Sequence, residues 1–333
     1  MKLTEQEREI VSCMYFRADV PVRQVAEETG LREGVIRGCI ARLLERKAIE
    51  LRPFINPFAV GLCEFQALIS THGMEPQIRQ KLLQALVESQ YSTYVGAIGG
   101  DFHLAVMLVA RDVAELNSIF DAMNGHVGNT PYEREVSSCS SISFYAPKYL
   151  QGNTYGPPSL TYGPVEQRWT IDDLDQRLLF ALGELKSISI SELARAVGAP
   201  ATTINYRLSG LKEKGILLGV GYALPPLNDG LLPFALQVRA ASISPSIRAQ
   251  MRQYCATHPA ISYMIEGAGS WEFQIGIRLT DMRQSTAVAE DIRRTFAPHV
   301  TKVTTIPVYD TLKVLPYPLM AVWPCRRSQV AAG

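Results

Sequence analysis

The sequence predicts an α+β fold made of two copies of one unit, each a winged helix-turn-helix followed by a ferredoxin-like (β-α-β-β-α-β) domain. Two observations predict this fold. The chain aligns with itself at a shift of 168 residues, which places Ala26 on Ala194 and Gly30 on Gly198. After each matched segment the same order of apolar-patterned stretches follows. A chain of 333 residues also exceeds what one core usually serves, so several domains are expected.

A helix-turn-helix is expected near the start of each copy. The spacing predicts helices over 4–15, 22–29 and 32–47, and in the second copy over 190–197 and 200–214, after a helix that Asp172 and Asp173 begin. In both copies an alanine lies four residues before a glycine. The alanine lets two helices cross closely, and the glycine supplies a left-handed turn. The repetition of this spacing strongly favours the motif over three unrelated helices.

Each helix-turn-helix is followed by a short extended stretch, over 51–58 and 217–223, which predicts a wing or connecting strand. Six further segments then alternate between strand and helix patterns. Their expected ranges are 63–70, 75–89, 91–98, 101–109, 112–124 and 132–145 in the first copy, and 234–241, 246–257, 261–266, 271–278, 281–296 and 300–310 in the second. Apolar residues alternate with others from Trp271 to Arg278, which predicts a half-buried strand.

The domain boundaries follow from these segments. We expect helix-turn-helix domains over 1–52 and 169–222, and sensor domains over 60–150 and 232–318. Residues 151–168 are rich in Gly and Pro, which disfavour regular structure, so we expect a linker there.

The charged residues are balanced over the whole chain but not within single helices. The whole chain has 33 Lys and Arg against 32 Asp and Glu, which gives no general attraction to nucleic acid. The third helices are basic: 31–47 has five basic and two acidic residues, and 198–214 has three and one. Double-stranded DNA is therefore the expected partner, although a merely solvated charged face is the alternative. The candidate DNA-binding residues are Arg32, Arg37, Arg42, Thr202, Thr203, Asn205, Arg207 and Lys212.

The position of a residue along the third helix decides its expected contact. Arg32, Arg37, Thr202, Thr203 and Asn205 come early and could reach base edges, whereas Arg42 and Lys212 are better placed for phosphates. Gly34 and Gly38 interrupt the first of these helices, each at a cost of about 1 kcal/mol relative to Ala. They indicate either a close approach to DNA or to a neighbouring helix, or a copy that no longer reads DNA.

The remaining composition predicts a cytoplasmic protein without a metal or cofactor. The six cysteines are scattered and form no metal-binding or disulfide pattern. Neither a signal peptide nor a run of about 18 apolar residues is found, so no contact with a membrane is expected.

These motifs resemble the Lrp/AsnC (feast/famine) family of transcriptional regulators, once in each copy. The resemblance rests on the repeated helix-turn-helix, on 211–216 (Leu-Lys-Glu-Lys-Gly-Ile) and on 99–103 (Gly-Gly-Asp-Phe-His). It implies a small-molecule effector, such as an amino acid, bound at the glycine-acid turn between sensor domains. The residues so implicated are Gly100, Asp101, His103, Gly269, Ser270 and Glu272. His103 and Ser270 depart from the Gly-Asp-x-Asp pattern, and a plain hairpin turn is the alternative.

The resemblance also implies an assembly. Single-copy relatives pair through their sensor sheets, so one fused chain is expected to form a pseudo-dimer with its sensor sheets face to face. Homo-oligomers of such pseudo-dimers are expected as well. Because 32–37 and 200–205 differ in sequence, the two DNA half-sites need not be palindromic.

Two other functions share this architecture. Sirohaem decarboxylases resemble the chain in fold, but they carry histidines and arginines around the second and third sensor strands, and 91–98 and 261–266 contain neither. We therefore expect no enzyme. The second alternative is a sensor or adaptor that has lost DNA binding, which the basic third helices argue against.

Overall fold

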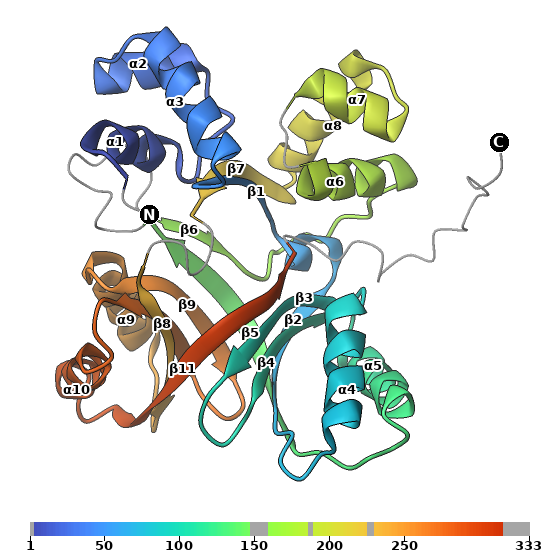
Figure 1. The fold of residues 1–333 in the computed structure, drawn as a ribbon, viewed down its shortest axis with the longest axis vertical. Helices are drawn as coiled ribbons and strands as arrows, with labels where there is room; N and C mark the ends of the chain where they lie inside the picture. The colour runs from blue at the N-terminus through green and yellow to red at the C-terminus, as the bar shows by residue number, and fades with distance from the viewer. Residues whose placement is uncertain (1–2, 147–158, 186–188, 225–229, 316–333) are drawn as a thin grey trace.

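The computed structural model describes residues 3–146, 159–185, 189–224 and 230–315. Two helical heads lie at one end of the molecule and two sheet-based sensor domains lie at the other (Figure 1). The first head contains Glu5–Met14 (α1), Val22–Thr29 (α2), Glu33–Glu45 (α3) and Glu50–Ile55 (β1). The second contains Asp173–Leu185 (α6), Ile190–Val197 (α7), Ala201–Glu213 (α8) and Leu217–Ala223 (β7).

Local chemistry sets the ends of these helices. Thr4 and Glu7 form a capping box at the start of α1, in which each side chain accepts a hydrogen bond from the other's backbone N–H. Gly30 and Gly198 end α2 and α7 in the left-handed conformation, with φ of 70° and 71°. The repeated glycine therefore has the turn role that its spacing predicted.

Strands β1 and β7 join the two heads in an antiparallel ribbon. Arg52 pairs with Gly221, and Pro53 pairs with Val220. The 168-residue shift (52 to 220, 53 to 221) exchanges these two pairs, so a pseudo-twofold axis passes through the ribbon. Gly221 is required here, because a Cβ atom on it would clash with the Tyr15 carbonyl oxygen.

Each sensor domain has the ferredoxin-like strand order. The first contains Cys63–Ile69 (β2), Pro76–Glu88 (α4), Ser92–Ile98 (β3), Leu104–Ala110 (β4), Val113–His126 (α5) and Arg134–Tyr145 (β5). The second contains Leu232–Ala240 (β8), Pro245–Thr257 (α9), Ile261–Ala268 (β9), Phe273–Leu279 (β10), Gln284–Thr295 (α10) and Val300–Val314 (β11). Strand neighbours are β5-β2-β4-β3 and β11-β8-β10-β9. The predicted fold class is confirmed.

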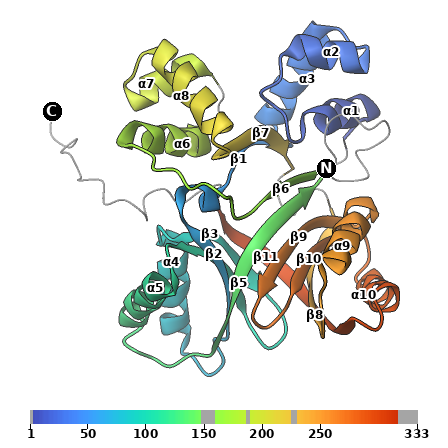
Figure 2. The ribbon, with the colours of Figure 1, turned by 180° about the vertical axis from the view of Figure 1, so that it is seen from behind.

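The two sensor sheets of one chain also close on each other. Strand β5 pairs with β9 of the second copy, and β11 pairs with β3 of the first, which makes eight strands a closed ring (Figure 2). The pairs Ile98–Val308 and Gly267–Cys139 exchange under a shift of 169 (98 to 267, 139 to 308). The chain therefore contains the expected pseudo-dimer, with the sheets joined strand to strand around a shared interior.

The heads rest on this ring through a row of aromatic rings. Phe16 contacts Phe54 of β1, Phe54 contacts Phe144 of β5, and Phe144 contacts Tyr162, with ring centroids 5.5, 5.9 and 6.2 Å apart. Between β1 and β2 a short 3-10 helix, Pro57–Val60, also leads from the first head into the ring.

Two sequence-based expectations need correction. The linker 151–168 was expected to lack regular structure, but Ser159–Tyr162 forms strand β6, because the edge of β5 at Ile142–Tyr145 offers backbone partners. Residues 147–158 lie outside the described part of the chain. The strand around Trp271–Arg278 was expected to be half-buried, but Gln274 and Gly276 are buried too, because its second face is turned into the ring.

Within the described residues, no helix is both long enough and apolar enough to cross a bilayer.

Candidate nucleic-acid interface and effector turns

Helix α3 of the first head presents three candidate arginines to solvent. Arg32 lies at the start of the helix, and Arg37 and Arg42 follow on its exposed side. Arg37 forms an ion pair with Glu33 one turn earlier, at 2.9 Å, and its side chain keeps 64% of its surface exposed. Such an exposed pair contributes little to stability, so Arg37 remains available to a phosphate or a base.

Helix α8 of the second head presents polar groups at the corresponding positions. Thr202 and Asn205 are exposed, and Thr203 is half-buried. Tyr206, which is not among the predicted DNA-binding residues, is 77% exposed. An aromatic residue on the polar side of an amphipathic helix was the signal that could have identified it. The 168-residue shift places Tyr206 on Gly38, so the two third helices differ at this position.

Two candidate cations of the second head are held in internal ion pairs. Arg207 donates to Asp172 at 2.6 Å and to Asp175 at 3.2 Å, and the hydrogen bond to Asp172 raises the pKa of Arg207. These contacts fasten α8 to the start of α6. Lys212 forms an ion pair with Asp19 of the first head. The structure thus separates these two residues from the freely exposed candidates.

The two glycines of α3 meet nothing that would require them. A Cβ atom at Gly34 would find no described atom within 4 Å, and one at Gly38 would meet only the Arg42 side chain at 3.6 Å. Close packing against a neighbouring helix of the chain therefore does not explain them. The alternatives that remain are a close approach to DNA and the loss of DNA reading.

Each of the two candidate effector turns is held by an equivalent hydrogen bond. The turn between β3 and β4 contains Gly100, Asp101 and His103, and the turn between β9 and β10 contains Gly269, Ser270 and Glu272. His103 accepts a hydrogen bond through Nδ1 from the Thr71 backbone N–H at 3.0 Å. Glu272 accepts one from the Ala240 backbone N–H at 2.7 Å. His103 in the first copy and Glu272 in the second therefore fasten the turn to the end of the first sensor strand.

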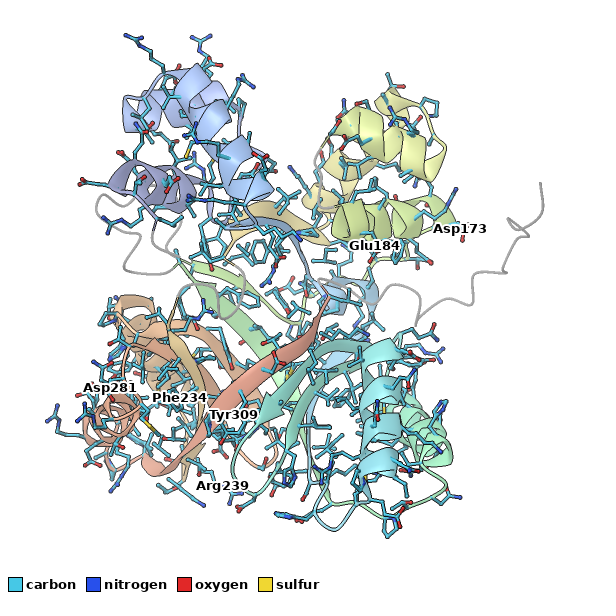
Figure 3. The ribbon with its side chains drawn as sticks, in the orientation of Figure 1. Asp173, Glu184, Phe234, Arg239, Asp281 and Tyr309 are labelled. Atoms are coloured by element: carbon cyan, nitrogen blue, oxygen red, sulfur yellow. The ribbon has the colours of Figure 1, made fainter. Side chains whose placement is uncertain are left out.

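The second turn is closed by contacts within the chain. Arg239 donates to the Ser270 carbonyl oxygen at 2.6 Å, and the Ser270 hydroxyl lies 3.0 Å from that of Ser137 on β5. Figure 3 shows Arg239 at the end of the sensor domains that faces away from the heads. A Cβ atom at Gly269 would lie 2.7 Å from the Ser137 hydroxyl oxygen. These contacts leave little of the turn free for a ligand.

The first turn is open and has polar groups around it. Gly100 and Asp101 are exposed, and the rings of His72 and His103 meet edge to face with centroids 4.6 Å apart. Burial, together with His72 and then Arg79, lowers the pKa of His103. Neither His72 nor Arg79 is among the residues predicted from the sequence. The two join His103 only because β2, α4 and β4 meet at this corner.

The chain matches known proteins in its second head and in its overall fold. Residues 171–217 match the winged helix-turn-helix DNA-binding family. An HTH-type transcriptional regulator of Pyrococcus abyssi is 27% identical over 43% of this chain and 95% of its own length. The proline dehydrogenase transcriptional activator of Rhodobacter capsulatus is 27% identical over 39% of this chain and 84% of its own length.

One solved structure has the same fold over nearly the whole chain. The siroheme decarboxylase NirDL superposes with a TM-score of 0.62 at 15% identity and covers 95% of this chain and 94% of its own. At this level of identity the match concerns the fold alone.

The winged heads, the relatives and the paired ferredoxin-like domains define a class, that of DNA-binding transcriptional regulators. Within that class the chain has a tandem form, with both copies of the unit in one polypeptide.

Proposed function

We propose that this protein is a sequence-specific regulator that reads two unequal DNA half-sites with one chain. The observation that carries the proposal is the pair of third helices, related by a pseudo-twofold axis but different at their exposed positions. Position for position, Arg37 corresponds to Asn205 and Gly38 to Tyr206. Pseudo-symmetric heads place two helices on one DNA face, and different side chains select different bases.

The exposed residues divide into three roles. Thr202, Asn205 and Tyr206 read bases in the second head, with Thr203 beside them, and Arg32 and Arg37 read bases or nearby phosphates in the first. Arg42 contacts the phosphate backbone. Arg207 acts as a positioning residue that holds α8 against α6, and Lys212 reaches a phosphate only by leaving Asp19.

We further propose that a small-molecule effector, such as an amino acid, binds at the first turn. Asp101 suits an ammonium group and Arg79 suits a carboxylate. The closed second turn gives Gly269, Ser270 and Glu272 a structural role, so one effector binds per chain. Binding there shifts the population of sensor arrangements and thereby the spacing of the heads. Pseudo-dimers assemble further into homo-oligomers, and the protein acts in the cytoplasm.

Capture of genomic DNA tests the proposal. Purified protein is incubated with sheared genomic DNA, with and without an amino-acid pool, and the retained fragments are sequenced. We expect a small set of strongly enriched sites whose enrichment changes with the pool. Recovery that is uniform across the genome contradicts sequence-specific reading.

The whole-chain likeness to NirDL raises a second candidate, decarboxylation of a tetrapyrrole. We favour a non-enzymatic protein, because the acceptor nitrogen of His103 is occupied by the Thr71 backbone and 91–98 contains no histidine or arginine. Incubation with sirohaem, followed by a search for decarboxylated products, distinguishes the two, since the regulator yields none.

A further inference from the structure

The second sensor domain holds a buried carboxylate between two arginines. Glu266 lies on β9 and keeps 3% of its side-chain surface exposed. Arg248 donates to its Oε2 at 3.1 Å and Arg252 to its Oε1 at 2.5 Å, both from α9. Burying a carboxylate is costly unless it is paired and hydrogen-bonded. These contacts therefore fasten α9 to the sheet through a negative charge that the chain itself supplies.

The first sensor domain has the same frame at this place but lacks the carboxylate. Helices α4 and α9 both begin at a proline, and the two prolines are 169 residues apart (76 to 245). The same shift places Arg79 on Arg248 and Ala97 on Glu266. One arginine is thus retained, while an alanine stands where the second domain has the glutamate.

The strand pairing confirms that Ala97 and Glu266 occupy equivalent positions. Ala97 lies opposite Asp310 of β11, and Glu266 lies opposite Ser141 of β5. These opposite residues are also 169 positions apart (141 to 310). In both domains the register shifts immediately before this pair. The equivalence therefore rests on backbone geometry as well as on the sequence.

In the first domain this place is accessible from solvent. Arg79 is exposed and Ala97 is half-buried, whereas Glu266 is buried. Within the described part of the chain, no ion pair includes Arg79. A glutamate side chain exceeds an alanine side chain by one CH2–COO⁻ group, which has the size of acetate. The first domain therefore presents an exposed cation where the second has a neutralised one.

Two further differences between the domains bear on the ligand. Leu83 stands where the second domain has Arg252, so a ligand carboxylate would meet one arginine and an apolar side chain. Asp310 stands where it has Ser141, which adds an exposed carboxylate beside Ala97. Asp310 suits an ammonium group and repels a simple carboxylate. An α-amino acid carries both an ammonium group and a carboxylate.

The place adjoins the effector turn of the first domain. Burial lowers the pKa of His103, and the charges of His72 and Arg79 lower it further. Arg79 therefore lies close enough to His103 for their charges to interact. Because His103 belongs to the turn, a ligand held by Arg79 lies beside the turn as well.

We infer that Glu266 is a built-in ligand carboxylate of the second sensor domain, and that the first domain takes up the carboxylate of its effector at the equivalent place, beside Arg79 and Ala97. This inference rests on the proposed binding of an effector at the first turn. It adds the subsite for the carboxylate and a reason why only one domain responds. The second domain stays in the arrangement that the effector produces in the first.

Sodium acetate tests the role of Glu266. Glu266→Ala removes an acetate-sized group from between two arginines, so the Tm should fall, and acetate should restore at least half of the loss. Sodium chloride at equal ionic strength should not restore it. Glu266→Gln is the matched control, because it removes the charge but fills the place, and acetate should leave its Tm unchanged. Equal effects of acetate and chloride on Glu266→Ala overturn the inference.

Thermal unfolding with the amino-acid pool tests the place in the first domain. The pool should raise the Tm of the wild type and of Lys81→Ala, an exposed control on the same helix. Arg79→Ala should need at least tenfold more of the pool for the same increase. Ala97→Glu gives the first domain a carboxylate of its own, so its Tm should be raised without the pool and should not rise further with it.

The two proposals fail in different ways. If the pool raises the Tm of Arg79→Ala as much as that of the wild type, the effector binds without this arginine and the inference alone is overturned. If the pool leaves the Tm of the wild type unchanged, effector binding itself is refuted, and with it the uptake of a carboxylate by the first domain. Acetate rescue of Glu266→Ala does not depend on the effector and decides the role of Glu266 in either case.

Discussion

His103 and Glu272 occupy equivalent positions in the two copies and make the same contact with different chemistry. Each accepts a hydrogen bond from a backbone N–H at the end of the first sensor strand, His103 through an imidazole nitrogen and Glu272 through a carboxylate oxygen. The turn is thus held in the same way in both copies. Only the first copy leaves its turn open.

The contact of His103 predicts a pH-dependent contribution to stability. The accepting Nδ1 must be unprotonated, and the pKa of His103 is lowered below 6.5. A group whose pKa falls on folding stabilises the protein above its unfolded value, and this contribution is lost as the pH drops through the folded pKa. His103→Leu should therefore cost about 1 kcal/mol at pH 7.5 and less at pH 5 by urea unfolding. A constant cost across that range would contradict the assigned contact.

Arg207 and Asn205 should separate stability from DNA reading. Removing Arg207 leaves Asp175, which is buried, without its cation, so Arg207→Ala should lower the free energy of unfolding by roughly 1–2 kcal/mol. Asn205→Ala removes an exposed side chain and should leave the Tm unchanged. It should weaken binding to a captured site by about 1–3 kcal/mol in gel-shift titrations. The reverse pattern would mean that the two residues have exchanged roles.

A substitution at Gly34 tests whether the side of α3 that carries this glycine lies close to DNA. Its Cβ position is open, so Gly34→Ala should stabilise the first head by about 0.5–1 kcal/mol in thermal unfolding. If α3 lies close to DNA, as we propose, the added methyl group should also weaken binding to the captured site. Gly125→Ala in α5 is the matched control, because its Cβ position is equally open but lies in a sensor domain. Stabilisation of the first head with unchanged DNA affinity would assign it an anchoring role only.

Glu64 should make the protein less stable in alkali. Its pKa rises from 4.5 to about 8 on folding because of burial, so the folded state holds a proton that the unfolded state has released. Stability from this group is full below pH 4.5 and declines as the pH rises to about 8. Glu64→Gln removes that decline and should raise the free energy of unfolding at pH 8.5 by more than about 1 kcal/mol. Denaturant titrations at pH 6 and 8.5 measure the difference.

Much of the fold could be predicted because it repeats. The left-handed glycines at 30 and 198 and the order of sensor strands depend on local spacing, which a single sequence displays twice. The burial of Gln274 could not be predicted, because it depends on the closure of two sheets into a ring. Strand β6 was missed for a related reason, since its partner edge on β5 exists only in the folded ring.

The sequence indicated where the candidate DNA-binding residues lie, but it did not indicate the contacts that each of them makes. The basic residues of the third helices predicted Arg37 and Arg42 as candidates, and both are exposed. The same pattern could not show that Arg207 is held by Asp172, a residue 35 positions earlier. The cluster of His72, Arg79 and His103 joins three separate elements, so no local pattern contained it. Likewise, Glu64 looks like an ordinary strand residue until the ring encloses it.

The central claim is that one chain reads two different half-sites with two different heads. Hydroxyl-radical footprinting on a captured site, with wild type and with Asn205→Ala, tests it most directly. We expect two protected segments of unequal sequence, with protection lost over one of them in the variant. A perfect inverted repeat, or equal loss over both segments, would contradict the account.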